Sequence, residues 1–212
     1  VEHMEAVPDA ARTMEGLRDT GYDFETAVAD LLDNSIAADA TLVDIRIEMD
    51  LEGSVHLAIA DNGHGMNRDG LVLAMRYGAP RRSDPSSLGK YGLGLKTAST
   101  AFCRELSVIS RDTAGGACVM ATWDLDHVVS TNKWDLLLSD EPPLDAVRHL
   151  EEIAPSAPGT VVVWHKVDRL MQSYQNPAGG HATKALAKPK LQLRDHLAAG
   201  SHRLLDTKVP RP

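Results

Sequence analysis

Two polar residues in one helical segment could support hydrolytic chemistry. The segment ETAVADLLDNSIAADA (25–40) places Asp30 and Asn34 four residues apart, so they share one helix face. A carboxylate can take a proton from water, and an amide oxygen is a good ligand for a hard cation. The pair could bracket a Mg²⁺ ion and an attacking water. An exposed polar stripe near a helix end is the alternative.

The segment DNGHG (61–65) directly follows a predicted strand. Asp61 at the strand end could accept a hydrogen bond from an exocyclic amine. Gly63 and Gly65 would let the backbone approach a flat ligand closely. An ordinary tight turn is the alternative, because D-x-G-x-G alone is a weak signal.

A third segment, LGKYGLGLKTAS (88–99), places glycines before a predicted helix. Free N–H groups at a helix start suit a phosphate chain. The segment is not a P-loop, because Leu95 separates Gly94 from Lys96 where that motif needs Gly-Lys-Ser/Thr. The basic residues before or within it could reach anionic oxygens or could be solvated loop charges: Arg81, Arg82 and Lys90.

A fourth signal is Gly159-Thr160, which opens a predicted strand. The Thr160 hydroxyl could bond to Asp61 and to a base edge. Threonine begins many strands, so this residue carries no weight on its own.

The elements that must position these residues follow from hydrophobic periodicity. In the helix at 25–40, Val28, Leu32 and Ile36 are expected to form the apolar arc. The remaining expectations are helices near 9–21, 68–78 and 95–102, a hairpin of strands 43–50 and 54–61, a hairpin of strands 105–112 and 117–124, a strand at 159–167, and one or two helices in 182–205. Residues 130–157 are poorly patterned. Strands arranged as hairpins, with helices before and between them, predict an α+β sandwich: one mixed but mostly antiparallel sheet with helices on one face.

Composition narrows the class of protein. The 212 residues have ordinary charged and apolar fractions and a net charge of −8, which fits one globular domain. No apolar run approaches a membrane span and no secretory leader is visible, so we expect a cytoplasmic protein without membrane contact. Cys103 and Cys118 are expected to be free thiols, and the histidine spacing does not suggest zinc.

Charge divides the chain into two parts. Residues 181–212 hold seven Lys and Arg against two Asp, so residues 1–180 are strongly acidic. An acidic body would repel a phosphate backbone. The basic segment could touch DNA, although a solvated helix face is the favoured interpretation.

Taken together, the order and spacing of the four motifs resemble the GHKL ATPases, a family that includes DNA gyrase, the heat-shock ATPase chaperone, MutL, histidine kinases and MORC proteins. The segments ADLLDNSIAADA, DNGHGM and GKYGLGLKTAS are most similar to the MORC-like and topoisomerase branches. The resemblance covers roughly residues 8–170. It implies the Bergerat fold, a two-layer α/β sandwich that holds ATP between sheet and helices under a lid.

The resemblance also implies roles for single residues. Asn34 would ligate Mg²⁺, and Asp61, helped by Thr160 and a water, would accept from the adenine amino group. Gly63 and Gly65 would make room for the base, with Met66 packed near it and His64 contributing only backbone. The phosphate loop and the start of the next helix would be Gly89, Lys90, Tyr91, Gly92, Leu93, Gly94, Leu95 and Lys96.

One position departs from the family pattern. The general base is usually Glu four residues before the Asn, and here that residue is Asp30. Its side chain is one methylene shorter, and a misplacement of about 1 Å can cost on the order of 10²-fold in rate. The sequence therefore leaves two functions open. One is a slow Mg²⁺-dependent ATPase that hydrolyses ATP to ADP, and the other is an ATP-binding switch or scaffold without significant turnover.

Domain organisation is expected to follow the charge division. Residues 1–180 would form the ATP-binding domain, and 181–212 a basic helical segment that begins a truncated transducer domain of a longer MORC-like protein. Nucleotide-dependent homodimerisation, and a DNA or protein partner bound through further domains, are what the resemblance implies.

Overall fold

Six strands form one sheet in the computed structural model, which describes residues 3–4, 6–50, 52–78, 94–170 and 186–197. Neighbouring strands pair antiparallel throughout. In spatial order the strands are β1 (Val43–Met49), β2 (Val55–Asp61), β6 (Gly159–Val167), β3 (Cys103–Arg111), β4 (Val119–Asp124) and β5 (Leu137–Ser139).

Both predicted hairpins are confirmed. In β1–β2, Ile45 lies opposite Ile59, and the turn is closed by Ser54, whose N–H donates to the Asp50 carboxylate. In β3–β4 the turn contains Gly115 with a φ of +67°. The late strand β6 enters between β2 and β3, so it joins the two hairpins into one sheet and places its first residues beside the end of β2.

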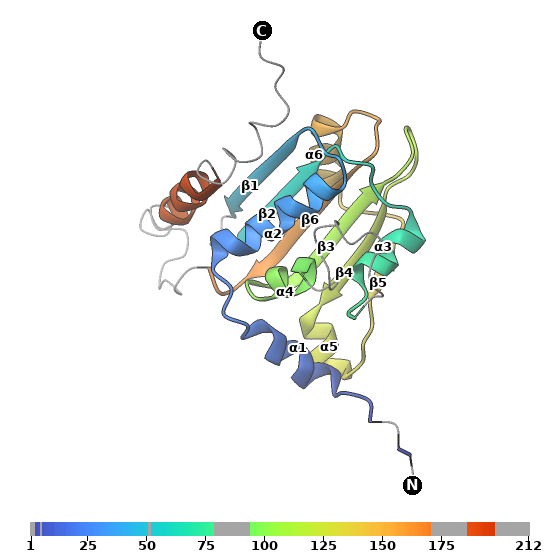
Figure 1. The fold of residues 1–212 in the computed structure, drawn as a ribbon, viewed down its shortest axis with the longest axis vertical. Helices are drawn as coiled ribbons and strands as arrows, with labels where there is room; N and C mark the ends of the chain where they lie inside the picture. The colour runs from blue at the N-terminus through green and yellow to red at the C-terminus, as the bar shows by residue number, and fades with distance from the viewer. Residues whose placement is uncertain (1–2, 5, 51, 79–93, 171–185, 198–212) are drawn as a thin grey trace.

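Helices α2 (Phe24–Ala37), α3 (Arg68–Met75) and α4 (Gly94–Thr100) lie over one face of the sheet, and α1 (Ala10–Arg18) and α5 (Leu125–Thr131) lie together at its lower end (Figure 1). The main hydrophobic core lies between these helices and the sheet. The expected α+β sandwich is therefore confirmed, with an antiparallel sheet.

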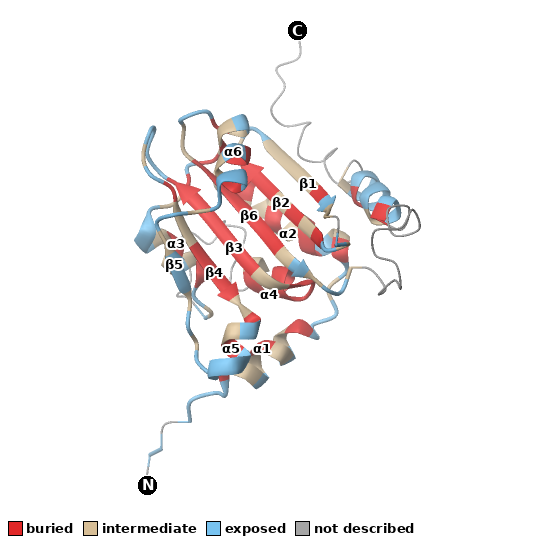
Figure 2. Cartoon of the chain, turned by 180° about the vertical axis from the view of Figure 1, so that it is seen from behind, coloured by how far each residue is buried: buried red, intermediate tan, exposed pale blue. Residues whose placement is uncertain are grey.

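A sixth helix departs from the expectation that helices cover a single face. Helix α6 (Leu144–Ile153) packs on the opposite face over the upper part of the sheet, as Figure 2 shows from behind. A second, smaller core forms there, because Ala60, Val161 and Val163 make alternate positions of β2 and β6 apolar on this side as well. With α5 and β5, this helix accounts for most of residues 130–157, where no pattern was visible.

The apolar arc of α2 also differs from the expected one. Ile36 is 37% exposed, so Val28, Leu32 and Ile36 do not form the buried stripe. The stripe consists of Phe24, Ala27, Val28, Leu31 and Ser35. This rotation leaves Asp30 and Asn34 half-buried at the margin of the core and brings Ser35 inside it.

Residues 186–197 form a helix beside the edge strand β1 in both views (Figures 1 and 2). Leu186 and Leu193 are buried in the main core, whereas Lys188, Lys190 and Arg194 are exposed. The basic side chains therefore face solvent. Among the helices of the described part, none combines the length and apolar character needed to cross a bilayer.

Candidate active site

Asp61, the last residue of β2, is held from two sides. Its side chain is only 6% exposed, with Oδ2 accepting from the Ser35 hydroxyl at 2.9 Å and Oδ1 from the Gly63 N–H at 2.9 Å. Burial raises the pKa of Asp61, while these two donors and the Thr160 backbone N–H lower it. The fold therefore fixes this carboxylate firmly at the end of a central strand.

Thr160 lies beside Asp61 in the β2–β6 ladder, but its hydroxyl is directed elsewhere. The Thr160 hydroxyl shares a 2.9 Å hydrogen bond with the hydroxyl of Ser110 on β3. The expected contact between the Thr160 hydroxyl and Asp61 is therefore replaced by a backbone contact. Ser110 also accepts from the Met66 N–H at 2.8 Å, so it ties the end of the glycine segment to the sheet.

The two glycines of DNGHG are required by the fold itself. A Cβ on Gly65 would lie 1.9 Å from the Arg111 carbonyl oxygen, and Gly65 has a φ of +63°. A Cβ on Gly63 would lie 2.7 Å from the Ala38 carbonyl oxygen. Close backbone packing explains both residues without a ligand. Clearance for an adenine ring at these positions stays a prediction.

Asp30 and Asn34 lie together on α2, as predicted. The Asn34 amide donates through Nδ2 to the Asp30 backbone carbonyl at 2.7 Å, which leaves its oxygen Oδ1 as the atom that could ligate a cation. The Asp30 carboxylate accepts from the Tyr22 hydroxyl at 3.0 Å. Nearby, burial and the negative charge of Asp30 raise the pKa of Asp33.

The start of α4 faces this pair. A Cβ on Gly94 would lie 3.7 Å from Asp30 Oδ2, so the end of the predicted phosphate segment meets the predicted base. Leu95 is partly buried against the main core. The other predicted phosphate-loop residues lie outside the described residues: Gly89, Lys90, Tyr91, Gly92 and Leu93.

Lys96 is placed differently from the phosphate contact that was expected. Its side chain is 1% exposed, its ammonium donates to the Ala74 carbonyl at 2.6 Å, and it lies 5.7 Å from the centre of the Tyr77 ring. Burial lowers the pKa of Lys96 to about 8. A helix end offers unpaired carbonyls, so a buried lysine at the end of α3 satisfies one of them. Contact with a phosphate would require this side chain to leave the core.

His64 is exposed and works through the main chain, as expected. Its N–H donates to the Ala38 carbonyl at 3.0 Å, which ties the glycine segment to the end of α2. The Nδ1 atom lies 2.7 Å from the Gly65 carbonyl. The charge of His64 also acts on Asp61 and lowers the pKa of that carboxyl against the rise that burial causes.

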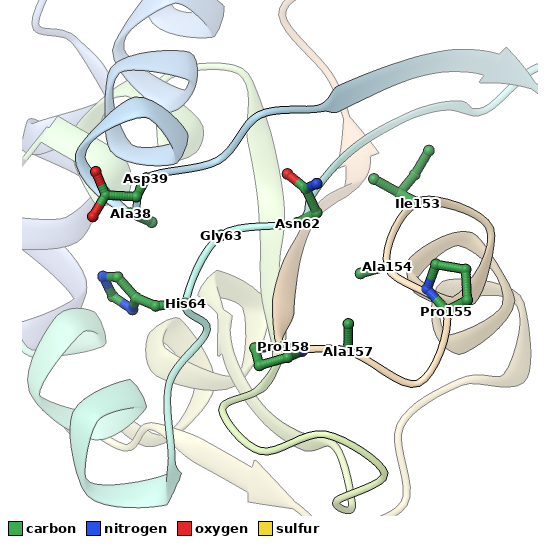
Figure 3. Close-up of a pocket in the computed structure, with 10 residues that line it drawn as sticks. All are labelled: Ala38, Asp39, Asn62, Gly63, His64, Ile153, Ala154, Pro155, Ala157 and Pro158. Atoms are coloured by element: carbon green, nitrogen blue, oxygen red, sulfur yellow. The ribbon is translucent and has the colours of Figure 1, made fainter.

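A hollow of about 380 Å³ lies on the other side of the glycine segment (Figure 3). Three segments line it: 38–39 after α2, 62–64, and 153–158 between α6 and β6. Neither Asp30, Asn34 nor Asp61 faces it. This hollow is therefore distinct from the candidate site. The two share the segment 62–64 as a common wall.

The protein oxygens present could hold a divalent cation only if a bound nucleotide supplied further oxygen ligands. In the described part of the chain, no three His, Cys, Asp or Glu side chains gather where they could hold a metal ion. Mg²⁺ usually keeps several waters and binds through one or two protein oxygens plus substrate phosphates. The single oxygen of Asn34 suits that mode of binding and would not suit a resident structural ion.

Several residues that shape the site were not identified from the sequence. Ser35, Tyr22 and Ser110 hold Asp61, Asp30 and the glycine segment respectively. Arg111 is a fourth: it is buried and donates to the carbonyls of Ala154 and Ala157, so it fixes the loop before β6. Of these four residues, only Ser35 could have been identified from the sequence, because it lies four residues after Leu31 and so on the buried side of the helix.

The chain is similar to MORC and MICRORCHIDIA proteins and to a DNA mismatch repair protein. The chain is 33% identical to ATPase MORC2B of Mus musculus over 97 residues, 44% of this chain and 10% of that protein. It is 28% identical to Protein MICRORCHIDIA 2 of Arabidopsis thaliana over 176 residues, 76% of this chain and 28% of that protein. It is 32% identical to the DNA mismatch repair protein MutL of Methanoculleus marisnigri over 97 residues, 43% of this chain and 17% of that protein. The chain thus spans about a tenth to just over a quarter of these relatives.

A family model covers the whole candidate site. It matches residues 22–160, which run from Tyr22 through α2, the glycine segment and α4 to Thr160. This is well over half of the chain, and it agrees with the antiparallel sheet and the covering helices. The chain therefore belongs to the histidine kinase-, DNA gyrase B- and HSP90-like ATPase family, the GHKL ATPases.

Proposed function

We propose that this chain binds Mg·ATP and hydrolyses it slowly to ADP and phosphate. The observation that carries the proposal is the fixed, buried carboxylate of Asp61. It is hydrogen-bonded to Ser35, the residue directly after Asn34 of the Asp30–Asn34 pair. Membership of an ATPase family supports the same reading of these residues.

Asp61 is suited to recognise the amino group of adenine. An ionised carboxylate has about four acceptor positions, and Ser35, Gly63 and the Thr160 N–H use only some of them. Desolvation strengthens a hydrogen bond to the remaining position. Asp61 must be ionised to accept from an amine, so protonation of this group would oppose binding.

Asn34 and Asp30 are suited to the phosphate end. Asn34 Oδ1 would ligate the magnesium ion, which supplies neutralisation of the phosphate charge when bound. Residues 89–94 are proposed as the phosphate loop, with Gly94 adjoining Asp30.

Asp30 is proposed as the general base of hydrolysis. It would take a proton from a water that attacks the γ-phosphorus, while the bond from that phosphorus to the bridging oxygen of ADP breaks. ADP leaves with the bonding electrons, and the proton ends on Asp30 before passing to solvent. Because Asp is shorter than Glu, we expect the rate to be low.

A second function, nucleotide-gated switching without useful turnover, is favoured by one observation. Asp30 is one methylene shorter than the Glu usual at this position. The family resemblance implies ATP-dependent lid closure and dimerisation, and one relative is named as a DNA mismatch repair protein, which supports a DNA partner bound through other parts of a longer chain. We extend this to the present protein as a proposal.

Steady-state phosphate release separates the two functions. We expect wild type to be about 10²-fold faster than Asp30→Asn, and Asp30→Glu to equal or exceed wild type because it restores the reach of the side chain. A wild-type rate no higher than that of Asp30→Asn would exclude hydrolysis and leave the switch. Size-exclusion elution with and without a non-hydrolysable ATP analogue, in magnesium buffer, tests dimerisation.

A further inference from the structure

Tyr22 reaches the Asp30 carboxylate from outside the helix that carries it. It lies in the connection between α1 and α2, two residues before α2 begins at Phe24. Gly21 precedes it with a φ of +73° and open space around it, so the glycine serves the turn that directs Tyr22 inward. The ring packs against the main core, which fixes its position.

The Tyr22 hydroxyl selects one oxygen of Asp30. It donates to Oδ2 at 3.0 Å, the same oxygen that faces Gly94 at the start of α4. Burial, followed by this hydrogen bond, raises the pKa of Tyr22, so the phenol stays protonated and remains a donor. The second oxygen, Oδ1, is left to accept a proton.

A second contact connects Tyr22 to α4. The side chain of Thr97, three residues after Gly94, hydrogen-bonds to the Tyr22 hydroxyl. Thr97 is buried, as α4 packs along α2. A chain of two hydrogen bonds therefore runs from α4 through Tyr22 to Asp30, linking the orientation of the carboxylate to the helix that follows the phosphate segment.

We propose that Tyr22 is a positioning residue that holds Asp30 in the rotamer needed for proton abstraction, and that Thr97 couples this rotamer to α4. The inference rests on the proposed hydrolysis. A short carboxylate has fewer ways to reach the attacking water than a glutamate has, so fixing its orientation matters more. A hydrogen bond to an ionised acceptor is also stronger than a neutral one.

The test is a double-mutant cycle on the full chain. Tyr22→Phe removes only the hydroxyl, Asp30→Asn removes the base, and the third variant carries both changes. Phosphate release at saturating Mg·ATP gives kcat, and titration with a non-hydrolysable ATP analogue gives Kd. We expect Tyr22→Phe to lower kcat about tenfold, with Kd changed less than about twofold, and to have no further effect when Asp30 is Asn.

Matched variants separate positioning from general damage. Tyr77→Phe makes the same chemical change at a buried hydroxyl whose neighbour is Thr100 and not Asp30, and kcat should not change. Thr97→Val should lower kcat by a smaller factor than Tyr22→Phe does, and Thr97→Ser, which keeps the hydroxyl, should restore it. Circular dichroism melts check that each variant is folded.

The outcomes distinguish this inference from the proposed function. If wild type is faster than Asp30→Asn but Tyr22→Phe equals wild type, positioning by Tyr22 is wrong while hydrolysis stands. The same loss from Tyr22→Phe in both backgrounds would also overturn it, because the hydroxyl would then act independently of Asp30. If wild type is no faster than Asp30→Asn, the hydrolysis proposal fails first.

Discussion

The two carboxylates beside and within α2 are held in different ways. Near the end of this helix, Asp61 of β2 is buried, and Ser35 and the Gly63 N–H engage one oxygen each. In its middle, Asp30 is half-buried and receives one side-chain hydrogen bond, from Tyr22. The group proposed to bind adenine is therefore fixed by the sheet and the helix together, whereas the group proposed for chemistry depends on a single contact from a loop.

This difference predicts that binding and turnover separate under mutation. Changes around Asp61 should weaken nucleotide binding, since they alter the acceptor proposed for the adenine amino group. Changes around Asp30 should slow hydrolysis and leave affinity nearly intact.

The largest effect is expected from Gly65→Ala. The new Cβ would lie 1.9 Å from a backbone carbonyl at a positive φ, so the segment that follows Asp61 must move. We expect a loss of unfolding free energy on the order of 4 kcal/mol, measured by urea denaturation. Gly115→Ala is the control, because Gly115 also has a positive φ but open space around it, and should cost only about 1 kcal/mol. Equal costs for both would contradict the role of close packing.

Asp61→Asn should weaken nucleotide binding without unfolding the protein. The substitution keeps the shape of the side chain but points an amide N–H₂ at Gly63 N–H or at Ser35 and weakens the acceptor for adenine. We expect affinity for a non-hydrolysable ATP analogue to fall about 10- to 100-fold by calorimetry. Asp30→Asn, the comparison, should change affinity less than about threefold. An unchanged affinity in Asp61→Asn would refute the adenine assignment.

Ser35→Ala should produce a smaller, pH-dependent loss. Burial already raises the pKa of Asp61 and the Ser35 hydroxyl opposes that rise, so its removal raises the pKa further. Because the ionised form must accept from the amine, affinity falls as the pH is lowered, and in the variant this fall should begin at a higher pH. Analogue titrations between pH 5 and 8 would measure it, and superimposable profiles for the two proteins would contradict the contact.

Lys96→Met should have the smallest effect on binding. The ammonium bonds to Ala74 inside the core, so we expect analogue affinity to change less than about twofold. A large loss of affinity would contradict this placement and support a contact between Lys96 and the phosphates.

Lys96 should instead leave a signature in the pH dependence of stability. Burial lowers its pKa to about 8, so the unfolded chain binds this proton more tightly than the folded chain does. Wild-type stability should rise relative to Lys96→Met as the pH increases from 8 to 10, and the difference should be constant below pH 7. Denaturation curves at these pH values would show it.

Local patterns made much of this molecule predictable. The alternating strands of both hairpins and the β-branched run of β6 needed no tertiary information, and the D-x-G-x-G segment placed Asp61 at a strand end. No element was predicted in residues 130–157, because β5 has only three residues and α6, which begins at Leu144, has Pro143 at its N-cap and no side-chain cap. The face that α6 covers could not be read from an amphipathic pattern, because β6 is buried on both sides.

The supporting residues of the site were less accessible to sequence reasoning. Tyr22 and Ser110 reach their partners from other segments, so no spacing along the chain indicates the contact. Lys96 lies two residues after the last glycine of a phosphate-like segment, yet its ammonium donates to the Ala74 carbonyl of α3, which holds the side chain in the core. In each case the direction of a side chain is decided by neighbours that are distant in sequence.

Calorimetric titration of a magnesium-loaded ATP analogue into wild type, Asp30→Asn and Asp61→Asn tests the division between binding and turnover directly. We predict one nucleotide bound per chain in wild type and in Asp30→Asn, and an affinity about 10- to 100-fold lower in Asp61→Asn. Absence of heat from a folded wild-type protein, or equal affinity in all three, would contradict it.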